Sequence, residues 1–239
     1  MINSSLITGN SSGLGLGLTM TLLRQGATVY GLSRRGCPLR SGKLHDRRCD
    51  LTDLNAIDSV LVDLLDGVTT LDIVILNAGV LGEVRDLSQT PQPDIEQMMT
   101  VNVWSNKVLI DFLIRKRVGI GQLVLISSGA SISGHRGWGA YSLSKATLNM
   151  LGRLYAREMP GTHIISLAPG LVDTAMQDYL CDPQKTDVSR YPSLQNLRDA
   201  RGTIGMPGPD EVAEKILKAV PQLPELFESG DYVDIRNLG

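Results

Sequence analysis

The sequence predicts an α/β protein with a parallel sheet covered by helices on both faces. Short apolar runs alternate with longer segments of helical spacing all along the chain. A glycine-rich turn, TGNSSGLGLG, joins the first apolar run to the first helical segment. The alternation continues through both halves of the 239 residues without a linker or an internal repeat. We therefore expect a single domain over residues 1–239.

The elements follow from this alternation in chain order. Strands are expected at residues 2–8, 28–33, 43–49, 71–76, 122–127, 163–167 and 231–235, and helices at 14–25, 54–65, 95–117, 140–157 and 210–220. Asp53 and Pro209 stand at the starts of two predicted helices. Helix amino termini favour a side-chain oxygen acceptor, such as that of Asp53, or the fixed φ of a proline. The segment at about 171–209 breaks the pattern with Pro183, Pro192 and Pro207. We interpret this segment as an insertion that forms a substrate lid, with a surface excursion as the alternative.

Composition excludes several classes of function. The 23 Lys and Arg against 25 Asp and Glu leave a net charge of −2, without the excess of basic residues that nucleic-acid binding needs. Three scattered cysteines and three histidines predict no metal site. The chain has neither a run of 18 apolar residues nor a leader-like amino terminus, so we expect a reduced cytoplasmic protein without membrane contact. Aromatic residues make up only 4% of the chain, which predicts an aliphatic core.

Glycines in the first turn indicate a phosphate site. Gly9, Gly13, Gly15 and Gly17 lie between the first strand and an apolar helix. Such a turn lets the backbone approach a diphosphate, and the helix amino terminus offers free N–H groups and a favourable dipole. A flexible turn without a ligand is the alternative interpretation. The strand before the glycines and the helix after them favour the phosphate site.

The end of the second strand indicates which dinucleotide would bind. A carboxylate there would bind the adenosine ribose of NAD, whereas this chain has Ser33 followed by Arg34 and Arg35. An arginine can pair with the 2′-phosphate of NADP, which an acid at this position would repel. We therefore expect NADP (NADPH), with a merely solvated arginine pair as the alternative.

A serine, a tyrosine and a lysine form a candidate catalytic group. Ser128 follows the strand QLVLIS, and Tyr141 and Lys145 are four residues apart, so they share one face of a helix. A phenol with its usual pKa of about 10 is a poor acid or base at neutral pH, but a nearby ammonium favours the phenolate. Ser128 could hold the substrate oxygen by a hydrogen bond. The set therefore suits proton exchange with a substrate oxygen.

The chain resembles the short-chain dehydrogenase/reductase family over essentially its whole length. The resemblance rests on motifs in the family's order and spacing: the TGxxxGxG turn, NAG at 77–79, VNV around Asn102, ISS up to Ser128, YSLSK at 141–145 and APG at 168–170. It implies a Rossmann-type, doubly wound sheet of seven parallel strands in the order 3-2-1-4-5-6-7. The coenzyme would lie across the carboxyl ends of the strands, as the switch-point rule also predicts.

The resemblance also implies a role for each matching residue. Tyr141 would be the general acid for carbonyl reduction, and Lys145 would hold the nicotinamide ribose and lower the tyrosine's pKa. Ser128 would orient the carbonyl, and Asn102 would help a water chain to relay protons. The adenine amino group would meet Asp50, and the nicotinamide carboxamide would meet Val172 and Thr174. The full coenzyme set is expected to be Gly9, Ser11, Ser12, Gly13, Leu14, Gly15, Ser33, Arg34, Arg35, Asp50, Leu51, Asn77, Ala78, Gly79, Tyr141, Lys145, Pro169, Gly170, Val172 and Thr174.

Within the family, the chain resembles sepiapterin reductases and bacterial benzil reductases. The resemblance lies in RGWGAYSLSKA, APGLVDTAMQ and the carboxyl-terminal ESGDYVDIRN. It implies a small-molecule carbonyl substrate such as a vicinal diketone, bound by Ser128, Tyr141, Trp138 and Asp234. A core-packed Trp138 and an ordinary strand-end Asp234 are the alternatives for those two residues. Family relatives also imply a homo-oligomer, a dimer or tetramer, that packs the helices at 95–117 and 140–157.

Two other functions remain open at this point. One is the same chemistry on a steroid, sugar or acyl carbonyl, because substrate loops vary freely on one scaffold. The other is an NADP-sensing regulator without catalytic activity. A pure sensor has no need for a phenol and an ammonium at this spacing, so the enzyme is the favoured interpretation.

Overall fold

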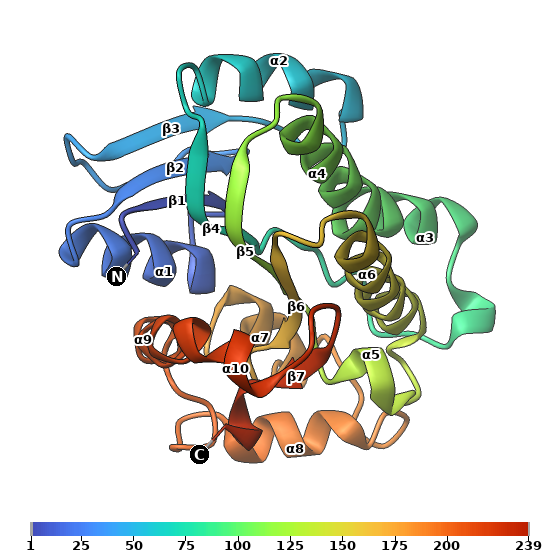
Figure 1. The fold of residues 1–239 in the computed structure, drawn as a ribbon. Helices are drawn as coiled ribbons and strands as arrows, with labels where there is room; N and C mark the ends of the chain where they lie inside the picture. The colour runs from blue at the N-terminus through green and yellow to red at the C-terminus, as the bar shows by residue number, and fades with distance from the viewer. Residues whose placement is uncertain (1, 239) are drawn as a thin grey trace.

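A computed structural model describes residues 2–238 and contains a sheet of seven parallel strands (Figure 1). The spatial order is β3-β2-β1-β4-β5-β6-β7, which confirms the predicted order. The strands are β1 (Ser4–Thr8), β2 (Thr28–Ser33), β3 (Leu44–Arg48), β4 (Thr70–Leu76), β5 (Gly119–Ile126), β6 (His163–Ala168) and β7 (Tyr232–Asp234). The chain reverses its direction of travel across the sheet between β1 and β4, where ligands bind in open α/β sheets.

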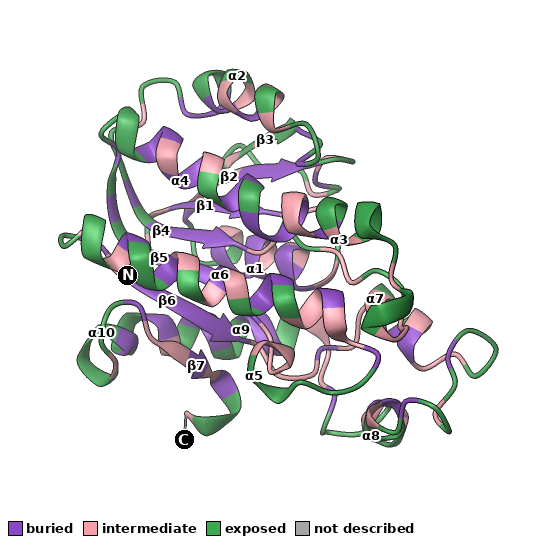
Figure 2. Cartoon of the chain, turned by 90° about the vertical axis from the view of Figure 1, so that its right-hand side faces the viewer, coloured by how far each residue is buried: buried purple, intermediate pink, exposed green. Residues whose placement is uncertain are grey.

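Helices pack on both faces of the sheet around two apolar clusters. On one face lie α1 (Gly13–Arg24) and α9 (Pro209–Ala219), whose leucines, valines and isoleucines meet β1, β4 and β6. On the other face lie α2 (Leu54–Leu64), α4 (Ser105–Arg115) and α6 (Gly139–Glu158). Figure 2 shows the central strands of the sheet buried and the outer helix surfaces exposed. The predicted aliphatic core is therefore present as two layers.

The helix predicted at 95–117 is present as a helical stretch over residues 92–115, but it contains a π-helical turn that the periodicity does not predict. The structure has α3 (Gln92–Met99), a π-helical turn (Thr100–Trp104) and then α4. At the π turn, Asn102 directs its side-chain amide to the backbone of Val80 and to the Ser144 hydroxyl. Asn106 donates to the carbonyl oxygen of Asn102 at 2.8 Å. The contacts of Asn102 with Val80 and Ser144 leave no mark in the apolar periodicity, so the sequence does not predict the π turn.

The segment at 171–209 contains two helices that the periodicity does not predict, α7 (Ala175–Leu180) and α8 (Ser193–Ala200). They enclose a small apolar cluster of their own, made of Leu180, Tyr191, Leu194, Leu197 and Met206. The short α5 (Ala130–Ser133) and α10 (Leu223–Leu226) are also absent from the prediction. All four helices have eight residues or fewer, so each is too short to establish a helical period.

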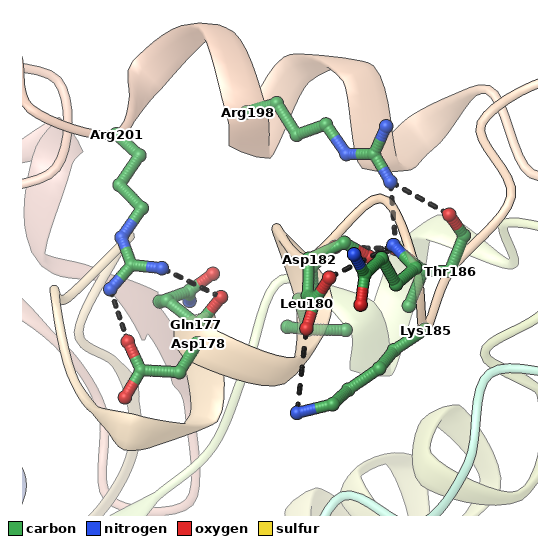
Figure 3. A network of polar contacts seen from close by, with 9 residues as sticks. Gln177, Asp178, Leu180, Asp182, Lys185, Thr186, Arg198 and Arg201 are labelled. Atoms are coloured by element: carbon green, nitrogen blue, oxygen red, sulfur yellow. Dashed lines mark hydrogen bonds and ion pairs between the residues drawn. The ribbon is translucent and has the colours of Figure 1, made fainter.

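Two arginines at the end of α8 tie it to α7 and to the loop that follows α7 (Figure 3). Arg201 donates to the carbonyl oxygen of Gln177 at 3.2 Å and pairs with Asp173 and Asp178. Arg198 donates to the carbonyl oxygen and the hydroxyl of Thr186, at 2.7 and 3.0 Å. The segment is therefore a braced unit with its own core.

Between residues 2 and 238, the model has no helix that is both long and apolar enough to cross a membrane. The same residues contain no group of three or more His, Cys, Asp or Glu side chains that could hold a metal ion.

Close packing of α1 on α9 at Gly17 gives a testable prediction. A Cβ at Gly17 would lie 2.8 Å from the carbonyl oxygen of Pro209. Gly17→Ala should therefore lower the free energy of unfolding by about 1–3 kcal/mol, although alanine favours helices. Gly161→Ala is the control, because no atom lies within 4 Å of its Cβ. Urea denaturation measures both, and a Gly17→Ala protein as stable as wild type would contradict the packing argument.

Candidate active site

A cleft of about 680 Å³ runs along the carboxyl ends of the strands. It is lined by the glycine-rich turn after β1, the ends of β2 and β3, the NAG segment after β4, and residues following β5 and β6. The structure brings nearly all the predicted site residues together in this one cleft. Three of them do not line it: Gly15, Asn102 and Asp234.

The glycine-rich turn depends on backbone packing that only glycine permits. Gly9 has a φ of 73°, and a Cβ at Gly15 would lie 2.3 Å from the carbonyl oxygen of Gly9. Ser12 stands at the N-cap of α1 and makes no side-chain bond to the first turn. Its hydroxyl instead accepts a hydrogen bond from Arg35 at 2.9 Å. The first N–H groups of α1 are thus left for an anionic ligand in the cleft.

At the end of β2, the cleft carries positive charge and an unpaired hydroxyl. Ser33 is buried and its hydroxyl has no partner within residues 2–238, while Arg34 is exposed beside it. Asp50, after β3, accepts hydrogen bonds from the backbone and hydroxyl of Thr52 at 3.0 and 2.9 Å. These bonds and the nearby charge of Arg34 hold the pKa of Asp50 below its usual value. Asp50 therefore stays ionised and able to accept from an amino group.

The two predicted asparagines hold the backbone around the cleft. Asn77 donates to the carbonyl oxygen of Thr8 at 3.0 Å, which ties the NAG segment to the end of β1. The side chain of Asn102 is fully engaged with Val80 and Ser144, at 2.8 to 2.9 Å. A Cβ on Gly79 would lie 3.3 Å from Asn102 Oδ1 and 3.4 Å from Lys145 Nζ. The absence of a side chain at Gly79 thus keeps the space beside Lys145 open.

Tyr141 and Lys145 lie on the first turns of α6 and face the cleft. Lys145 is only 3% exposed, and its Nζ donates to the carbonyl oxygen of Ile126 at 2.7 Å and lies 5.8 Å from the centre of the Tyr141 ring. Burial lowers the pKa of Lys145 to about 8. Burial also raises the pKa of Tyr141, and a hydrogen bond with Ser128 opposes this rise. The phenol is therefore protonated and held by Ser128 at neutral pH.

Trp138 connects this group to the lid segment. Its ring lies 6.2 Å from the ring of Tyr141, and its indole N–H donates to the hydroxyl of Ser193 at 2.8 Å, where α8 begins. Asp234 lies elsewhere. Both its oxygens are held by Arg236, at 2.9 and 2.6 Å, and its side chain is 11% exposed. The structure therefore places Trp138 at the cleft and Asp234 in an ion pair outside it.

Gln177 is among the cleft residues that the sequence-based prediction leaves out. Gln177, on α7, is 7% exposed, and its Oε1 has no hydrogen-bond partner among residues 2–238. The available signal was a polar residue in the APGLVDTAMQ stretch, but that stretch alone does not show which side chains point into the cleft.

The fold and the cleft together define a Rossmann-fold dinucleotide-binding protein with a serine, a tyrosine and a lysine at one end of its site. A model of the short chain dehydrogenase family matches residues 3–185, and the chain belongs to that family. It is therefore an oxidoreductase that acts on CH–OH or C=O groups, with the family's NAD(P)-binding fold. The predicted family and enzyme class are confirmed.

Proteins similar to this chain indicate which type of oxidoreductase it resembles. The chain is 34% identical to a benzil reductase ((S)-benzoin forming) of Saccharomyces cerevisiae over 190 residues, which cover 72% of each chain. It is 28% identical to a Bacillus subtilis benzil reductase ((S)-benzoin forming), with 97% of each chain covered. The crystal structure of the KRED1-Pglu enzyme superimposes with a TM-score of 0.83 at 25% identity, covering 97% of this chain and 100% of that one. These relatives support a carbonyl reductase.

The burial of Lys145 predicts a specific pH dependence of stability. Because its pKa falls from 10.5 to about 8 on folding, the unfolded chain binds more protons between these values. This residue's contribution to the free energy of unfolding should thus rise with pH across that window, by up to about 3 kcal/mol. Lys145→Met should lose this rise.

Urea denaturation of the ligand-free protein at pH 7, 8, 9 and 10 measures the effect. Lys116→Met, which removes an exposed lysine, is the control and should keep the wild-type slope. If the difference in unfolding free energy between wild type and Lys145→Met does not change with pH, burial does not lower the pKa of this lysine.

Proposed function

We propose that the protein is an NADPH-dependent reductase of activated ketones, and of vicinal diketones such as benzil in particular. The observation that carries the proposal is the single cleft that joins the glycine-rich turn and Arg34 to Ser128, Tyr141 and Lys145. The benzil reductases among its relatives support the substrate class.

The residues of the cleft fit a dinucleotide with a 2′-phosphate. The glycine-rich turn and the amino terminus of α1 would bind the diphosphate, and Asp50 the adenine amino group. Arg34 is exposed at the end of β2, where Ser33 contributes no negative charge, so it would pair with the 2′-phosphate. Arg35 already donates to Ser12 and would close over the diphosphate. Residues 169–174 would border the nicotinamide, since they line the cleft beside Tyr141.

In the proposed mechanism, the bound coenzyme supplies a hydride to the carbonyl carbon. Ser128 donates a hydrogen bond to the carbonyl oxygen and Tyr141 gives that oxygen its proton. Lys145, with a pKa of about 8, is a suitable proton source for the phenolate that remains. The side chain of Asn102 holds the π turn and the Val80 backbone in place beside Lys145. A proton relay through water would start at this point. Each proton transfer in this mechanism thus has a named side chain as its donor.

The substrate would lie between Trp138 and the segment at 171–209. That segment contributes Leu171, Met176, Leu180 and other apolar side chains to the cleft, which suits its proposed role as a lid. We leave Asp234 out of the proposed substrate contacts, because Arg236 holds both of its carboxylate oxygens. The apolar side chains of this segment suit the aryl groups of such a diketone.

A homo-oligomer is also proposed. Large apolar side chains lie exposed along α4 and α6, the helices that the family resemblance places at the subunit contact. They are Trp104 at the start of α4, Ile114, Leu143, Met150 and Leu154, with exposed fractions of 41 to 55%. Such a concentration of apolar surface on adjacent helices is typical of a protein interface.

The proposed general acid gives the central prediction of this function. Wild-type protein should oxidise NADPH in the presence of benzil, and Tyr141→Phe should lower kcat by at least about 100-fold, since general acid catalysis contributes about 10²–10⁴-fold. NADPH binding, measured by fluorescence titration, should persist in the variant. Tyr155→Phe, remote from the cleft, is the matched control. Undiminished benzil reduction by Tyr141→Phe would refute the assigned acid.

The coenzyme preference can be tested by adding one charge. Ser33→Asp should lower kcat/KM for NADPH by about 10-fold or more, because like charges about 4 Å apart cost about 1–4 kcal/mol. NADH should be less affected, since it lacks the 2′-phosphate. Ser41→Asp adds the same charge outside the cleft and should leave both values within about 2-fold. A wild-type preference for NADH would contradict the assignment.

A further inference from the structure

The side-chain amide of Asn149, on α6, forms hydrogen bonds on both of its sides. Its Oδ1 accepts from the hydroxyl of Ser127 at 2.6 Å, and its Nδ2 donates to the hydroxyl of Ser131 at 2.9 Å. Ser131 in turn donates to the carbonyl oxygen of Ser128 at 2.7 Å. Asn149 therefore holds the residue before Ser128 directly and the backbone of Ser128 through one hydroxyl.

The hydrogen-bond directions in this network require an amide at position 149. The hydroxyl proton of Ser131 is used on the Ser128 carbonyl, so this hydroxyl can only accept from Asn149. The NH2 group must then face Ser131, which leaves the amide oxygen to accept from Ser127. A side chain with a donor and an acceptor on one planar group satisfies both serines.

The short helix α5 fixes the hydroxyl of Ser128. Its Oγ accepts from the backbone N–H of Ala130 at 3.1 Å, and its carbonyl oxygen accepts from the backbone N–H of Ser131 at 3.0 Å. The bond from Ala130 occupies one side of the hydroxyl oxygen, and Ser128 is also hydrogen-bonded to Tyr141. The direction in which Ser128 can donate thus depends on where α5 lies.

Asn149 joins this turn to the helix that carries the rest of the catalytic group. Tyr141 and Lys145 are four residues apart on α6, as are Lys145 and Asn149, so the three follow one another along one side of the helix. Ser128 belongs to a different element, the loop between β5 and α5. In the proposed reaction Ser128 and Tyr141 must meet at one oxygen, and a misplacement of about 1 Å can cost about 100-fold in rate.

A second link between the same two elements comes from Lys145, which donates to the carbonyl oxygen of Ile126 at 2.7 Å. The lysine changes its charge in the proposed proton transfer. The amide of Asn149 is neutral, is partly buried and does not line the cleft. Its hydrogen bonds therefore use no atom that reacts.

We propose that Asn149 is a positioning residue that sets the place of the Ser128 hydroxyl relative to the Tyr141 phenol. The inference rests on the proposed function, in which both groups bind the substrate oxygen. Asn149 acts only through Ser127 and Ser131, which flank Ser128 in the chain. Its loss should consequently slow the chemical step and leave coenzyme binding intact.

The test is a double-mutant cycle with benzil and NADPH, measured as single-turnover NADPH oxidation so that slow variants can be followed. Asn149→Leu keeps the branched shape of the side chain and removes both hydrogen bonds, and it should lower the rate by about 10-fold or more. In a Ser128→Ala background, the same change should alter the rate by less than about 2-fold, because the hydroxyl that Asn149 positions is absent. A general disturbance of α6 would instead slow both backgrounds equally. The Kd for NADPH, measured by fluorescence titration, should stay within about 2-fold of the wild-type value in Asn149→Leu.

A second pair of variants makes the test independent of how well Asn149→Leu folds. Ser131→Ala removes the hydroxyl through which Asn149 reaches the Ser128 carbonyl, and Ser131→Thr keeps it. The alanine variant should be slower than wild type by about 5-fold or more, and the threonine variant should stay within about 2-fold. Thr147→Val is the matched control on α6, because the Thr147 hydroxyl donates within the helix, to the carbonyl oxygen of Leu143 at 2.8 Å. It should react at the wild-type rate.

Each outcome decides the inference. Equal losses for Asn149→Leu in the two backgrounds would overturn it, as would a wild-type rate or a weaker Kd for NADPH in that variant. A threonine variant as slow as Ser131→Ala would contradict it as well. All these results leave the proposed reductase standing. If wild-type protein does not oxidise NADPH with benzil, the proposed diketone reductase fails, and the role of Asn149 fails with it.

Discussion

Parallel pairing of all seven strands is the constraint on which the rest of this structure depends. It places the carboxyl ends of β1, β2, β4, β5 and β6 along one edge, so segments far apart in the sequence line one cleft. The glycine-rich turn completes this arrangement, since Gly15 packs against the carbonyl oxygen of Gly9 with no room for a Cβ. The start of α1 can then face the cleft with its first N–H groups free.

The sequence predicts the features that are determined by residues close together in the chain. The strands, the glycine-rich turn and the i, i+4 relation of Tyr141 and Lys145 all depend on neighbouring residues, and the fold and family were confirmed on this basis. The π turn at Asn102 depends on Val80 and Ser144, far away in the chain. Arg236 is only two residues from Asp234, but the proximity in sequence does not show that its guanidinium holds both carboxylate oxygens. Helices α7 and α8 are too short for their periodicity to be recognised. Their own small core and two arginines stabilise them instead.

Burial changes the chemical state of the catalytic group from what its spacing suggests. From spacing alone, the ammonium of Lys145 is expected to favour the phenolate of Tyr141. In the ligand-free cleft both side chains lose water, so the charged form of each is disfavoured: the pKa of the lysine falls and that of the tyrosine rises. The ligand-free enzyme therefore has a protonated phenol, which is the form that carbonyl reduction needs. The cost of burying Lys145 is offset in part by its bond to the carbonyl oxygen of Ile126.

The two halves of the cleft are built by different means. The part of the cleft at the glycine-rich turn consists of strand ends and backbone, whereas the part beside Trp138 is bordered by the braced segment at 171–209 with its separate core. Asp86 joins that segment to the rest of the site, because it accepts from Arg136 and Arg190 at 2.7 to 2.8 Å, and both arginines lie over the ring of Tyr191. Trp138 adds a second connection through Ser193. Side chains on α7 and α8 can consequently vary with little effect on the sheet, which explains physically how one coenzyme scaffold accepts different carbonyl substrates.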